Sequence, residues 1–290
     1  MITRAQPWLG TMVGIRIDAC PQADAAFDAA FAAIRRVHEL MSFHCPRSEL
    51  SLLNRQAYEK TTPVSRWTYA VIARALELSK ASGGLFDCTI APHLTRLGLL
   101  PTPRAQGSER ARVNSGAPSQ FSAVQLLAGN RIRFDCPLWL DLGGIGKGFA
   151  VDRAVEALQA YDIPSACVNA GGDLRVYGES PTSIRVRLPG APGQSAALIN
   201  LQNGAVATSA AYLGGSRGAA PATSPVIDPR SGATCRAGIS VSVHAADCVT
   251  ADALTKVVAI SENAEHPILS RMQASAVLLR AASAESGSAT

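Results

Sequence analysis

The sequence lacks the cysteine spacing of a disulfide framework or a zinc site. Its seven cysteines are odd in number, form no C-x-x-C pair and mostly stand among apolar residues. Regularly paired cysteines mark disulfide-rich secreted domains and structural zinc sites. We therefore expect reduced thiols packed in the interior, a reducing compartment and a cytoplasmic location.

Long runs of one kind of residue are also missing. No stretch is apolar for long enough to predict a membrane span, and residues 1–7 lack the apolar core of a signal peptide. The net charge is only +5, and the lysines and arginines are scattered. This distribution argues against a nucleic-acid partner, and a small anionic ligand fits it better.

Common catalytic signatures are absent as well. The chain has no H-E-x-x-H motif and no Ser-His-Asp spacing, and its five histidines are isolated. A Walker A loop is excluded because Lys147 is followed by glycine rather than by serine or threonine. The dinucleotide fingerprint is excluded because the last glycine of residues 144–149 comes one position early.

What is present is the composition of an ordinary globular protein, with 290 residues of which 47% are hydrophobic and 17% charged. Such a chain can bury a sizeable core. Strand and helix patterns alternate without an internal repeat or a sharp change in composition. We predict an α+β fold, a mixed β-sheet with packed helices in a single domain over residues 1–280, and a disordered tail at 281–290. The alternative is two lobes that close on a cleft.

Apolar spacing places the individual elements. Helices are expected over residues 24–42, 65–81, 149–161 and 266–273, with a further helix that begins at Thr250 as its N-cap. Strands are expected over residues 12–19, 138–140, 166–168, 174–177, 183–188, 197–201, 205–209, 239–245 and 276–279, with a hairpin over 125–133. Residues 101–120 and 213–224 have no periodicity and are expected to be loops, the first a surface loop or a lid.

The strongest local signal is the stretch from Asp141 to Gly148, Asp-Leu-Gly-Gly-Ile-Gly-Lys-Gly. It joins a short apolar run to a helical pattern, which predicts a strand, a glycine turn and a helix. Glycines at such a junction let the backbone approach a ligand, and the N–H groups of a helix start favour an anion. The same glycines could serve the turn alone. Phosphate binding is therefore suggested, but no reaction is defined.

Several turns of this kind carry a single carboxylate. These are Asp87, Asp141, Asp173, Asp228 and Asp252. Carboxylate and carbonyl oxygens suit Mg²⁺, which shares its ligand shell with substrate phosphates. Plainer roles are available: Asp87 can cap a turn, and Asp252 can favour a helix start and pair with Lys256. A Gly-Gly-Asp at 171–173 inside a strand pattern marks a bulge or a close backbone approach.

Eight segments, in this order, resemble the successive signatures of the ApbE-type FAD:protein FMN transferases. They are residues 9–11, 41–43 with 48–54, 86–92, 141–152, 168–173, 207–209, 227–232 and 251–254. The resemblance covers nearly the whole chain, from Leu9 to about Ile260. It implies a T-fold-like α+β architecture with an FAD cleft between two lobes.

The resemblance also implies a reaction. Mg²⁺ neutralises the pyrophosphate of FAD while a threonine hydroxyl of an acceptor flavoprotein attacks the phosphorus on the FMN side. AMP leaves, and FMN stays on the threonine as a phosphoester. The implied ligands are therefore FAD, Mg²⁺ and an acceptor protein that presents a threonine.

Site residues follow from the same resemblance. FAD would lie against Leu9, His44, Asp87, Thr89, Asp141, Lys147, Gly171, Gly172, Asp173, Thr208 and Asp228. A carbonyl of the turn at Gly144 would hold Mg²⁺ together with Asp252 and Thr255, and the transfer step would involve Asp252, Thr255 and Lys256. Asp252 is expected to be a surface-cleft acid whose removal leaves the fold intact.

The chain departs from the family pattern at two positions. The family usually has histidine three residues before the aspartate at Asp228, where this chain has Pro225. It usually has threonine four residues after Asp252, where this chain has Lys256. Lys256 could pair with Asp252, contact phosphate in place of metal charge, or exclude Mg²⁺. A non-catalytic FAD-binding homologue and a Mg²⁺-dependent FAD pyrophosphatase are the alternative functions.

Overall fold

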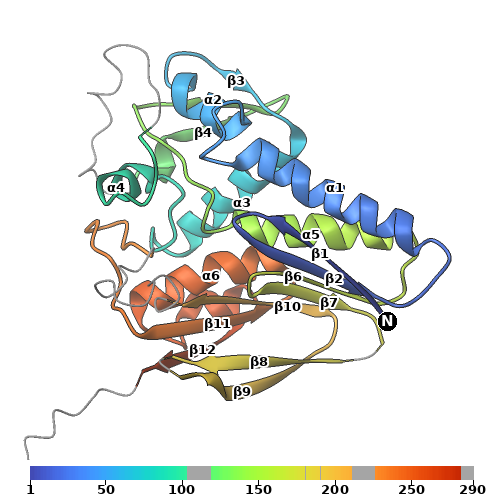
Figure 1. Cartoon of the computed structure of the whole chain (residues 1–290). Coiled ribbons are helices and arrows are strands. Elements are labelled where there is room, and N and C mark those ends of the chain that lie inside the picture. The colour runs from blue at the N-terminus through green and yellow to red at the C-terminus, as the bar shows by residue number, and fades with distance from the viewer. Residues whose placement is uncertain (103–118, 180, 190, 211–225, 282–290) are drawn as a thin grey trace, which may run out of the picture.

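The protein is an α+β fold in which helices and strands interleave along the chain, as predicted (Figure 1). The computed structural model describes residues 1–102, 119–179, 181–189, 191–210 and 226–281. Most of the loop expected at 101–120, nearly all of the tail expected at 281–290, and the whole loop at 213–224 lie outside the described residues. The domain limits stay a prediction. Within the described ranges, no helix is long and apolar enough to cross a membrane.

A seven-stranded sheet forms the centre of the molecule, in the order β1-β2-β6-β7-β10-β11-β12. Its strands are Ile2–Trp8, Thr11–Ile17, Ala166–Ala170, Asp173–Tyr177, Gly204–Ala210, Ile239–Ala245 and Ser275–Arg280. Neighbouring strands all pair antiparallel. The mixture of strand directions that we expected is therefore not found in this sheet. Two-residue turns join β1 to β2 and β6 to β7, and such turns allow only antiparallel pairing.

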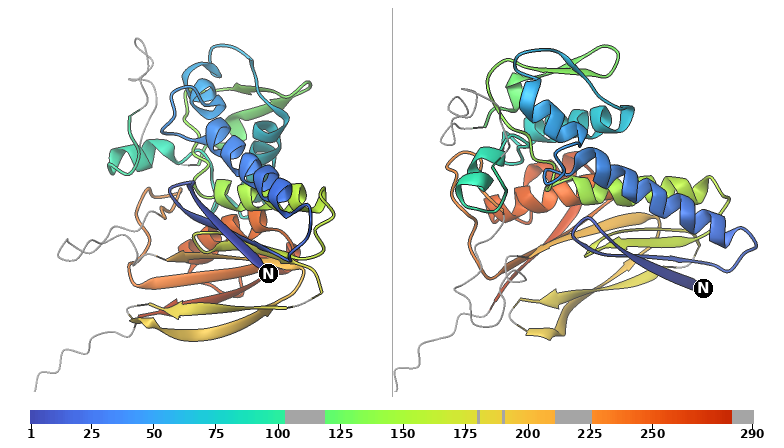
Figure 2. Two further views of the ribbon diagram at one scale, coloured as in Figure 1. Left: turned by 45° about the vertical axis from the view of Figure 1, so that its right-hand side comes forward. Right: turned by 45° about the horizontal axis from the view of Figure 1, so that its top comes forward.

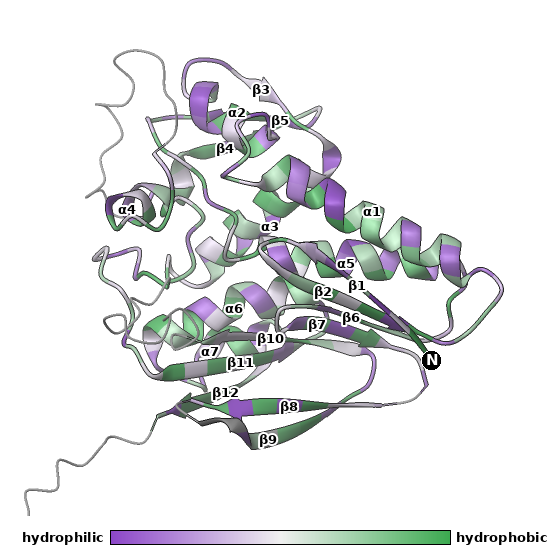
Figure 3. Ribbon diagram, in the orientation of Figure 1, coloured by the Kyte–Doolittle hydropathy of each residue, from purple (hydrophilic) through white to green (hydrophobic). Residues whose placement is uncertain are grey.

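One face of the sheet is covered by α1 (Ala23–Met41), α5 (Gly146–Gln159) and α6 (Cys248–Ser261), which lie side by side (Figures 1 and 2). Figure 3 shows hydrophilic and hydrophobic bands alternating along α1, as the apolar spacing predicts for an amphipathic helix. Ile34, Val155 and Leu254 are fully buried in the main core that these helices form with the sheet.

The other face carries a two-stranded ribbon of β8 (Thr182–Leu188) and β9 (Ala191–Leu201). A smaller apolar cluster lies between this ribbon and the sheet and includes Leu174, Val206 and Leu201. Beyond the helix layer lies an upper module (Figures 1 and 2). It contains α2 (Glu49–Gln56), α3 (Arg66–Ala81), α4 (Ala91–Arg96), η2 (Phe121–Ala123) and a small sheet of β3 (Thr62–Pro63), β5 (Arg131–Phe134) and β4 (Val124–Leu127). The short α7 (Pro267–Arg271) precedes β12.

Local signals fixed several element ends as expected. The Ser48 side chain caps α2 by accepting from the Ser51 N–H at 3.0 Å, and Ser65 caps α3 in the same way through the Thr68 N–H. Residues 83–84 end α3 with positive φ angles, which glycine adopts without a steric penalty. The predicted hairpin at 125–133 is present as β4 and β5.

The strand predicted at 138–140 is wrong. Leu140 is extended but pairs with a side chain: its N–H donates to the Asn54 Oδ1 at 2.7 Å and its carbonyl accepts from the Asn54 Nδ2 at 2.9 Å. The next N–H, of Asp141, donates to the Cys88 carbonyl at 2.8 Å. An amide side chain thus takes the place of a neighbouring strand, and apolar spacing cannot distinguish the two cases.

The bulge considered at 171–173 is a hairpin turn instead. Gly171 and Gly172, with φ angles of +66° and +105°, connect β6 to β7 with Ala170 opposite Asp173. The close backbone approach is confirmed, because a Cβ atom on Gly171 would lie 2.5 Å from the Thr11 Oγ1. Only glycine satisfies both demands.

The N-cap predicted for the helix at 250 is also wrong. Helix α6 begins three residues earlier, at Cys248, and the Asp247 side chain caps it by accepting from the Thr250 N–H at 2.8 Å. Both residue types are good N-caps, so the pattern alone left the choice open. Asp252 consequently lies inside the helix and is 0% exposed, which overturns its expected position in a surface cleft.

Candidate active site

A cavity of about 840 Å³ opens where β10, α6 and the turn before α5 meet the upper module. This volume lies in the range of sites that hold small molecules and cofactors. Of the predicted site residues, the cavity is lined by Leu9, His44, Asp87, Asp141, Gly144, Lys147, Gly171, Thr208 and Lys256. The predicted residues outside its lining are Thr89, Gly172, Asp173, Asp228, Asp252 and Thr255.

The glycine turn reaches the cavity as predicted. Helix α5 begins at Gly146, and its N-cap Ile145 provides no side-chain acceptor. The Gly146 N–H donates to the Leu142 carbonyl at 2.7 Å and the Gly148 N–H to the Asp252 Oδ2 at 3.0 Å, so the Lys147 N–H is the one that residues 146–148 leave for a ligand. Gly148 fits closely against α6, because a Cβ atom there would overlap the Cys248 carbonyl and lie 2.9 Å from the Asp252 Cβ. Gly144 lies under the side chain of Lys256, whose Cε would be 3.6 Å from an added Cβ.

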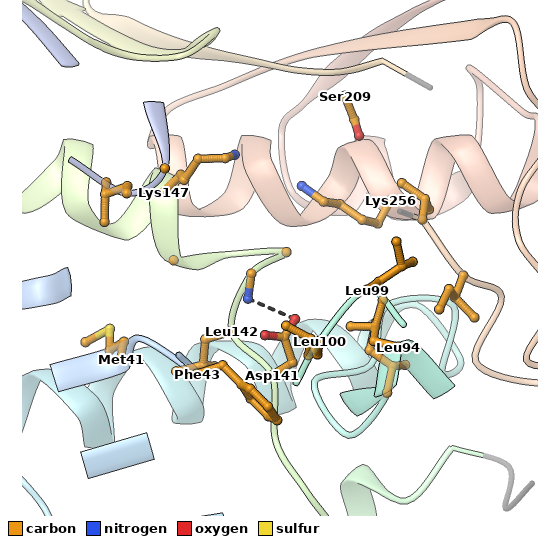
Figure 4. A pocket seen from close by; sticks show the side chains of 18 of the residues that line it. Met41, Phe43, Leu94, Leu99, Leu100, Asp141, Leu142, Lys147, Ser209 and Lys256 are labelled. Carbon is orange, nitrogen blue, oxygen red and sulfur yellow. Dashed lines mark hydrogen bonds between the residues drawn. The ribbon is translucent and has the colours of Figure 1, made fainter. Parts of the chain in front are cut away.

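Four charged side chains meet beside this turn and form what we call the charge cluster: Lys147, Asp173, Asp252 and Lys256. The Lys147 ammonium pairs with Asp173 and lies 3.9 Å from the Asp252 Oδ2. The Lys256 ammonium pairs with the Asp252 Oδ1 and donates to the Asp252 carbonyl at 2.9 Å. The Gly148 N–H donates to the Asp252 Oδ2 at 3.0 Å. Figure 4 shows the two lysine side chains pointing toward one another in the cavity.

Burial and mutual interactions shift the pKa values of three members of the charge cluster. Burial lowers the pKa of Lys147, but the charges of Asp252 and Asp173 outweigh it and raise the pKa above its ordinary value. Burial likewise opposes ionisation of Asp252, but Lys147 and Lys256 hold the pKa of Asp252 below its usual range. The pKa of Asp173 is raised by burial and by the neighbouring Asp252 charge. Asp173 and Asp252 are 2% and 0% exposed, so they act through the lysines rather than by touching a ligand.

The residues predicted to hold Mg²⁺ do not fit the ion in this arrangement. Both Asp252 carboxylate oxygens are engaged, one by Lys256 and the other by the Gly148 N–H. The buried Thr255 hydroxyl donates to the Asp252 carbonyl within α6 at 2.7 Å. In the part of the chain that the structure describes, no group of three or more His, Cys, Asp or Glu side chains is placed to hold a metal.

Asp141 lines the cavity below the charge cluster (Figure 4). Its Oδ2 accepts from the Gly143 N–H at 3.1 Å. Burial raises the pKa of Asp141 to about 6, although the Gly143 hydrogen bond and the His44 and Lys256 charges lower it. This carboxyl therefore changes charge close to neutral pH. His44 is exposed at the cavity wall, and its contact with a ring of FAD stays a prediction.

Asp87 has the turn-cap role that we considered for it. Its Oδ1 accepts from the Thr89 N–H at 2.7 Å and from the Thr89 hydroxyl at 2.8 Å, and burial raises the pKa of the carboxyl. The Thr89 hydroxyl accepts from the Gln120 N–H at 3.1 Å. Asp87 lines the cavity, so it can contact a ligand while it caps the turn. Thr89 is outside the lining and stabilises the turn through these hydrogen bonds.

Asp228 organises a turn at the edge of the cavity. It accepts from the Arg230 N–H at 2.9 Å and pairs with the Arg230 guanidinium at 2.7 Å, and these hydrogen bonds lower the pKa of the carboxyl. Its neighbours Ile227 and Pro229 line the cavity, but Asp228 does not. Pro225, which replaces the expected histidine, lies outside the described residues.

The sequence did not reveal the apolar wall of the cavity. It is formed by Phe43, Phe86, Leu94, Leu99, Leu100 and Ile260. Isolated apolar residues of this kind carry no signal that distinguishes a ligand wall from a core. Ser209 of β10 also faces the cavity (Figure 4). Apolar surface next to paired ammonium groups suits a ligand that joins flat rings to phosphates.

The chain is similar to known proteins over most of its length. The chain is 29% identical to the FAD:protein FMN transferase of Treponema pallidum, with 87% of this chain and 76% of that protein covered. It is also 29% identical to the enzyme of the same name from Vibrio cholerae, with coverage of 76% and 69%.

Solved structures show the same fold. The ApbE protein of Thermotoga maritima superposes with a TM-score of 0.82 at 25% identity and covers 97% of both chains. The flavin transferase ApbE from Vibrio cholerae superposes with a TM-score of 0.80 at 25% identity, over 96% of this chain and 92% of that one. The model of the ApbE family matches residues 9–278, and the chain therefore belongs to the ApbE family.

Proposed function

We propose that this protein is an FAD:protein FMN transferase, which binds FAD in the cavity and transfers its FMN moiety to a threonine hydroxyl of an acceptor protein. One observation carries the proposal: two lysine ammonium groups, a helix start and an apolar wall line the same 840 Å³ cavity. The relatives that share this fold carry the name of that activity.

The reaction exchanges the phosphoanhydride bond of FAD for a phosphoester bond to the acceptor. The acceptor oxygen bonds to the phosphorus on the FMN side, the P–O bond of the anhydride breaks, and AMP leaves with the bridging oxygen. The acceptor hydroxyl releases its proton to solvent water, which balances the step. Negative charge on the pyrophosphate is stabilised by the ammonium groups of Lys147 and Lys256 and by the Lys147 N–H at the start of α5.

The remaining site residues have supporting roles in this proposal. Asp173 and Asp252 are positioning residues, because each is buried and holds a lysine that faces the cavity. Leu9, Gly171 and Thr208 contribute to the cavity wall near the phosphates. The resemblance predicts Mg²⁺ held by Asp252, Thr255 and a carbonyl near Gly144, but no step above depends on it. The cytoplasmic location likewise stays a prediction.

The test is to incubate the purified chain with FAD and a threonine-containing acceptor peptide, with and without Mg²⁺. Mass spectrometry then measures AMP and peptide-bound FMN. Both products together support the transferase. Bound FAD without AMP would identify a non-catalytic FAD-binding homologue. Pro225 in place of the family's histidine favours this alternative. AMP together with free FMN would identify a pyrophosphatase.

A further inference from the structure

The lysine at position 256 occupies the space that a metal ion would need. Lys256 and Asp252 stand one turn apart on α6, and the ammonium group contacts both the carboxylate and the backbone carbonyl of Asp252. The Lys256 side chain lies over Gly144 in the turn before α5. The Lys256 side chain therefore passes over the turn, and its ammonium is held on the carboxylate; both were predicted to hold Mg²⁺.

The net charge of the charge cluster also argues against a bound Mg²⁺. Two carboxylates and two ammonium groups sum to zero, so the buried acids need no further cation. With a neutral side chain at position 256 the cluster would keep one negative charge, which a divalent cation could neutralise. With Lys256 present, a bound Mg²⁺ must displace the ammonium from Asp252 and then lie beside it, where two positive charges repel in a low-dielectric site.

The ammonium of Lys256 can still serve a ligand. An ammonium group has three N–H donors, and Lys256 uses two of them on Asp252. Lys256 lines the cavity together with Lys147, so both lysines present positive charge to the same space. Lysine binds phosphate as a point charge. A pyrophosphate that bridges the two lysines would be matched in sign without a metal.

We propose that Lys256 is the built-in cation of this site and that the cavity binds the pyrophosphate of FAD without a divalent metal. The inference rests on the proposed function, since it takes FAD as the ligand. Of the roles considered for Lys256, it assigns two: the ammonium excludes Mg²⁺, and it contacts phosphate directly.

The first experiment titrates FAD into the purified protein and follows flavin fluorescence, once in EDTA and once in MgCl₂. The wild type should bind FAD with dissociation constants that differ by less than about threefold between the two buffers. Lys256→Thr should bind FAD about tenfold more weakly in EDTA and recover when Mg²⁺ is added. Lys80→Thr, the same substitution at an exposed lysine of α3, should behave as the wild type.

A second readout uses Mg²⁺ alone, without FAD. Calorimetric titration should detect Mg²⁺ binding to Lys256→Thr but not to the wild type, and Mg²⁺ should raise the melting temperature of the variant only. The melting curve also shows whether the variant is folded. If Lys256→Thr does not fold, the titrations of the wild type test the proposal by themselves. The wild type must then bind FAD equally in both buffers and bind no Mg²⁺.

The outcomes separate the two proposals. Wild-type protein that binds FAD only in MgCl₂, or that binds Mg²⁺ by itself, overturns the built-in cation and leaves the transferase intact. Protein that binds FAD in neither buffer overturns the transferase, and the inference with it.

Discussion

At the scale of single residues, the two lysines of the cavity depend on two carboxylates that do not line it, those of Asp173 and Asp252. Asp252 is fully buried, yet it contacts Lys256 and the Gly148 N–H and lies near Lys147. A buried charge of this kind is tolerated because its partners surround it, and it becomes costly when one partner is removed. The positions of both lysines in the cavity therefore depend on an acid inside α6.

Asp252→Ala should destabilise the protein by about 3–5 kcal/mol, because it leaves two ammonium groups without their buried counter-charge. The measurement is the free energy of unfolding from denaturant titration. Asp24→Ala is the control, since the Asp24 side chain is 82% exposed in its pair with Arg4, and it should cost less than about 1 kcal/mol. Equal unfolding midpoints for Asp252→Ala and wild type would contradict the buried role.

Asp141 gives a stability effect that depends on pH. Its pKa is raised from 3.8 to about 6 on folding, so between these values the folded state binds more protons than the unfolded state. Ionisation of this buried carboxyl therefore lowers the free energy of unfolding as the pH rises through that window.

Asp141→Asn removes the free-energy cost of ionising the buried carboxyl. It should stabilise the protein at neutral pH by on the order of 1–3 kcal/mol, with little gain near pH 4. Denaturant titrations at both pH values measure it. In Asp228→Asn the sign reverses, because Arg230 lowers the pKa of Asp228 and its charged form is the stabilising one. A gain from Asp141→Asn that is the same at both pH values would count against the raised pKa.

At the scale of elements, the contact between α5 and α6 places the glycine turn beside the charge cluster. The sequence predicted α5, α6 and the turn, because helical spacing and glycine preferences are local signals. It did not predict that Asn54 replaces a strand beside Leu140 or that Asp247 caps α6, because each depends on a partner brought close only by folding. The buried position of Asp252 was missed for the same reason.

Gly148→Ala should destabilise the protein by about 1–3 kcal/mol, because the added methyl group would overlap the backbone of α6 at Cys248. Thermal unfolding measures the effect. Gly146→Ala is the matched control on the same helix: its Cβ meets nothing within 4 Å and its φ is not positive, so it should be neutral or slightly stabilising. An unchanged melting temperature for Gly148→Ala would contradict the close contact with α6.

At the scale of the whole molecule, the cavity gathers residues from both ends of the chain. Leu9 from the β1–β2 turn and Ile260 from α6 line it together. The order of motifs named the Asp and Lys residues that line the cavity, Asp87, Asp141, Lys147 and Lys256, and two of its glycines, Gly144 and Gly171. The apolar wall was not predictable, because only the assembled fold decides which leucine faces a ligand and which faces the core.

Leu99→Glu should weaken FAD binding by about tenfold, because it places a negative charge on the cavity wall opposite an anionic ligand. Leu99 is 38% exposed, so the fold should tolerate the change. Flavin fluorescence titration measures the dissociation constant. Leu198→Glu on β9, 61% exposed and outside the cavity lining, is the control and should bind as the wild type. An unchanged affinity for Leu99→Glu would place the ligand elsewhere.

The spread of the cavity along the chain has a consequence for how the protein is made. The turn at Leu9 leaves the ribosome early, whereas Lys256 and Ile260 emerge only after almost all of the sheet has been synthesised. A nascent chain that stops short of α6 lacks one wall and one of the two lysines. Flavin capture must therefore wait until translation of the family segment is nearly complete, so an unfinished chain cannot sequester FAD.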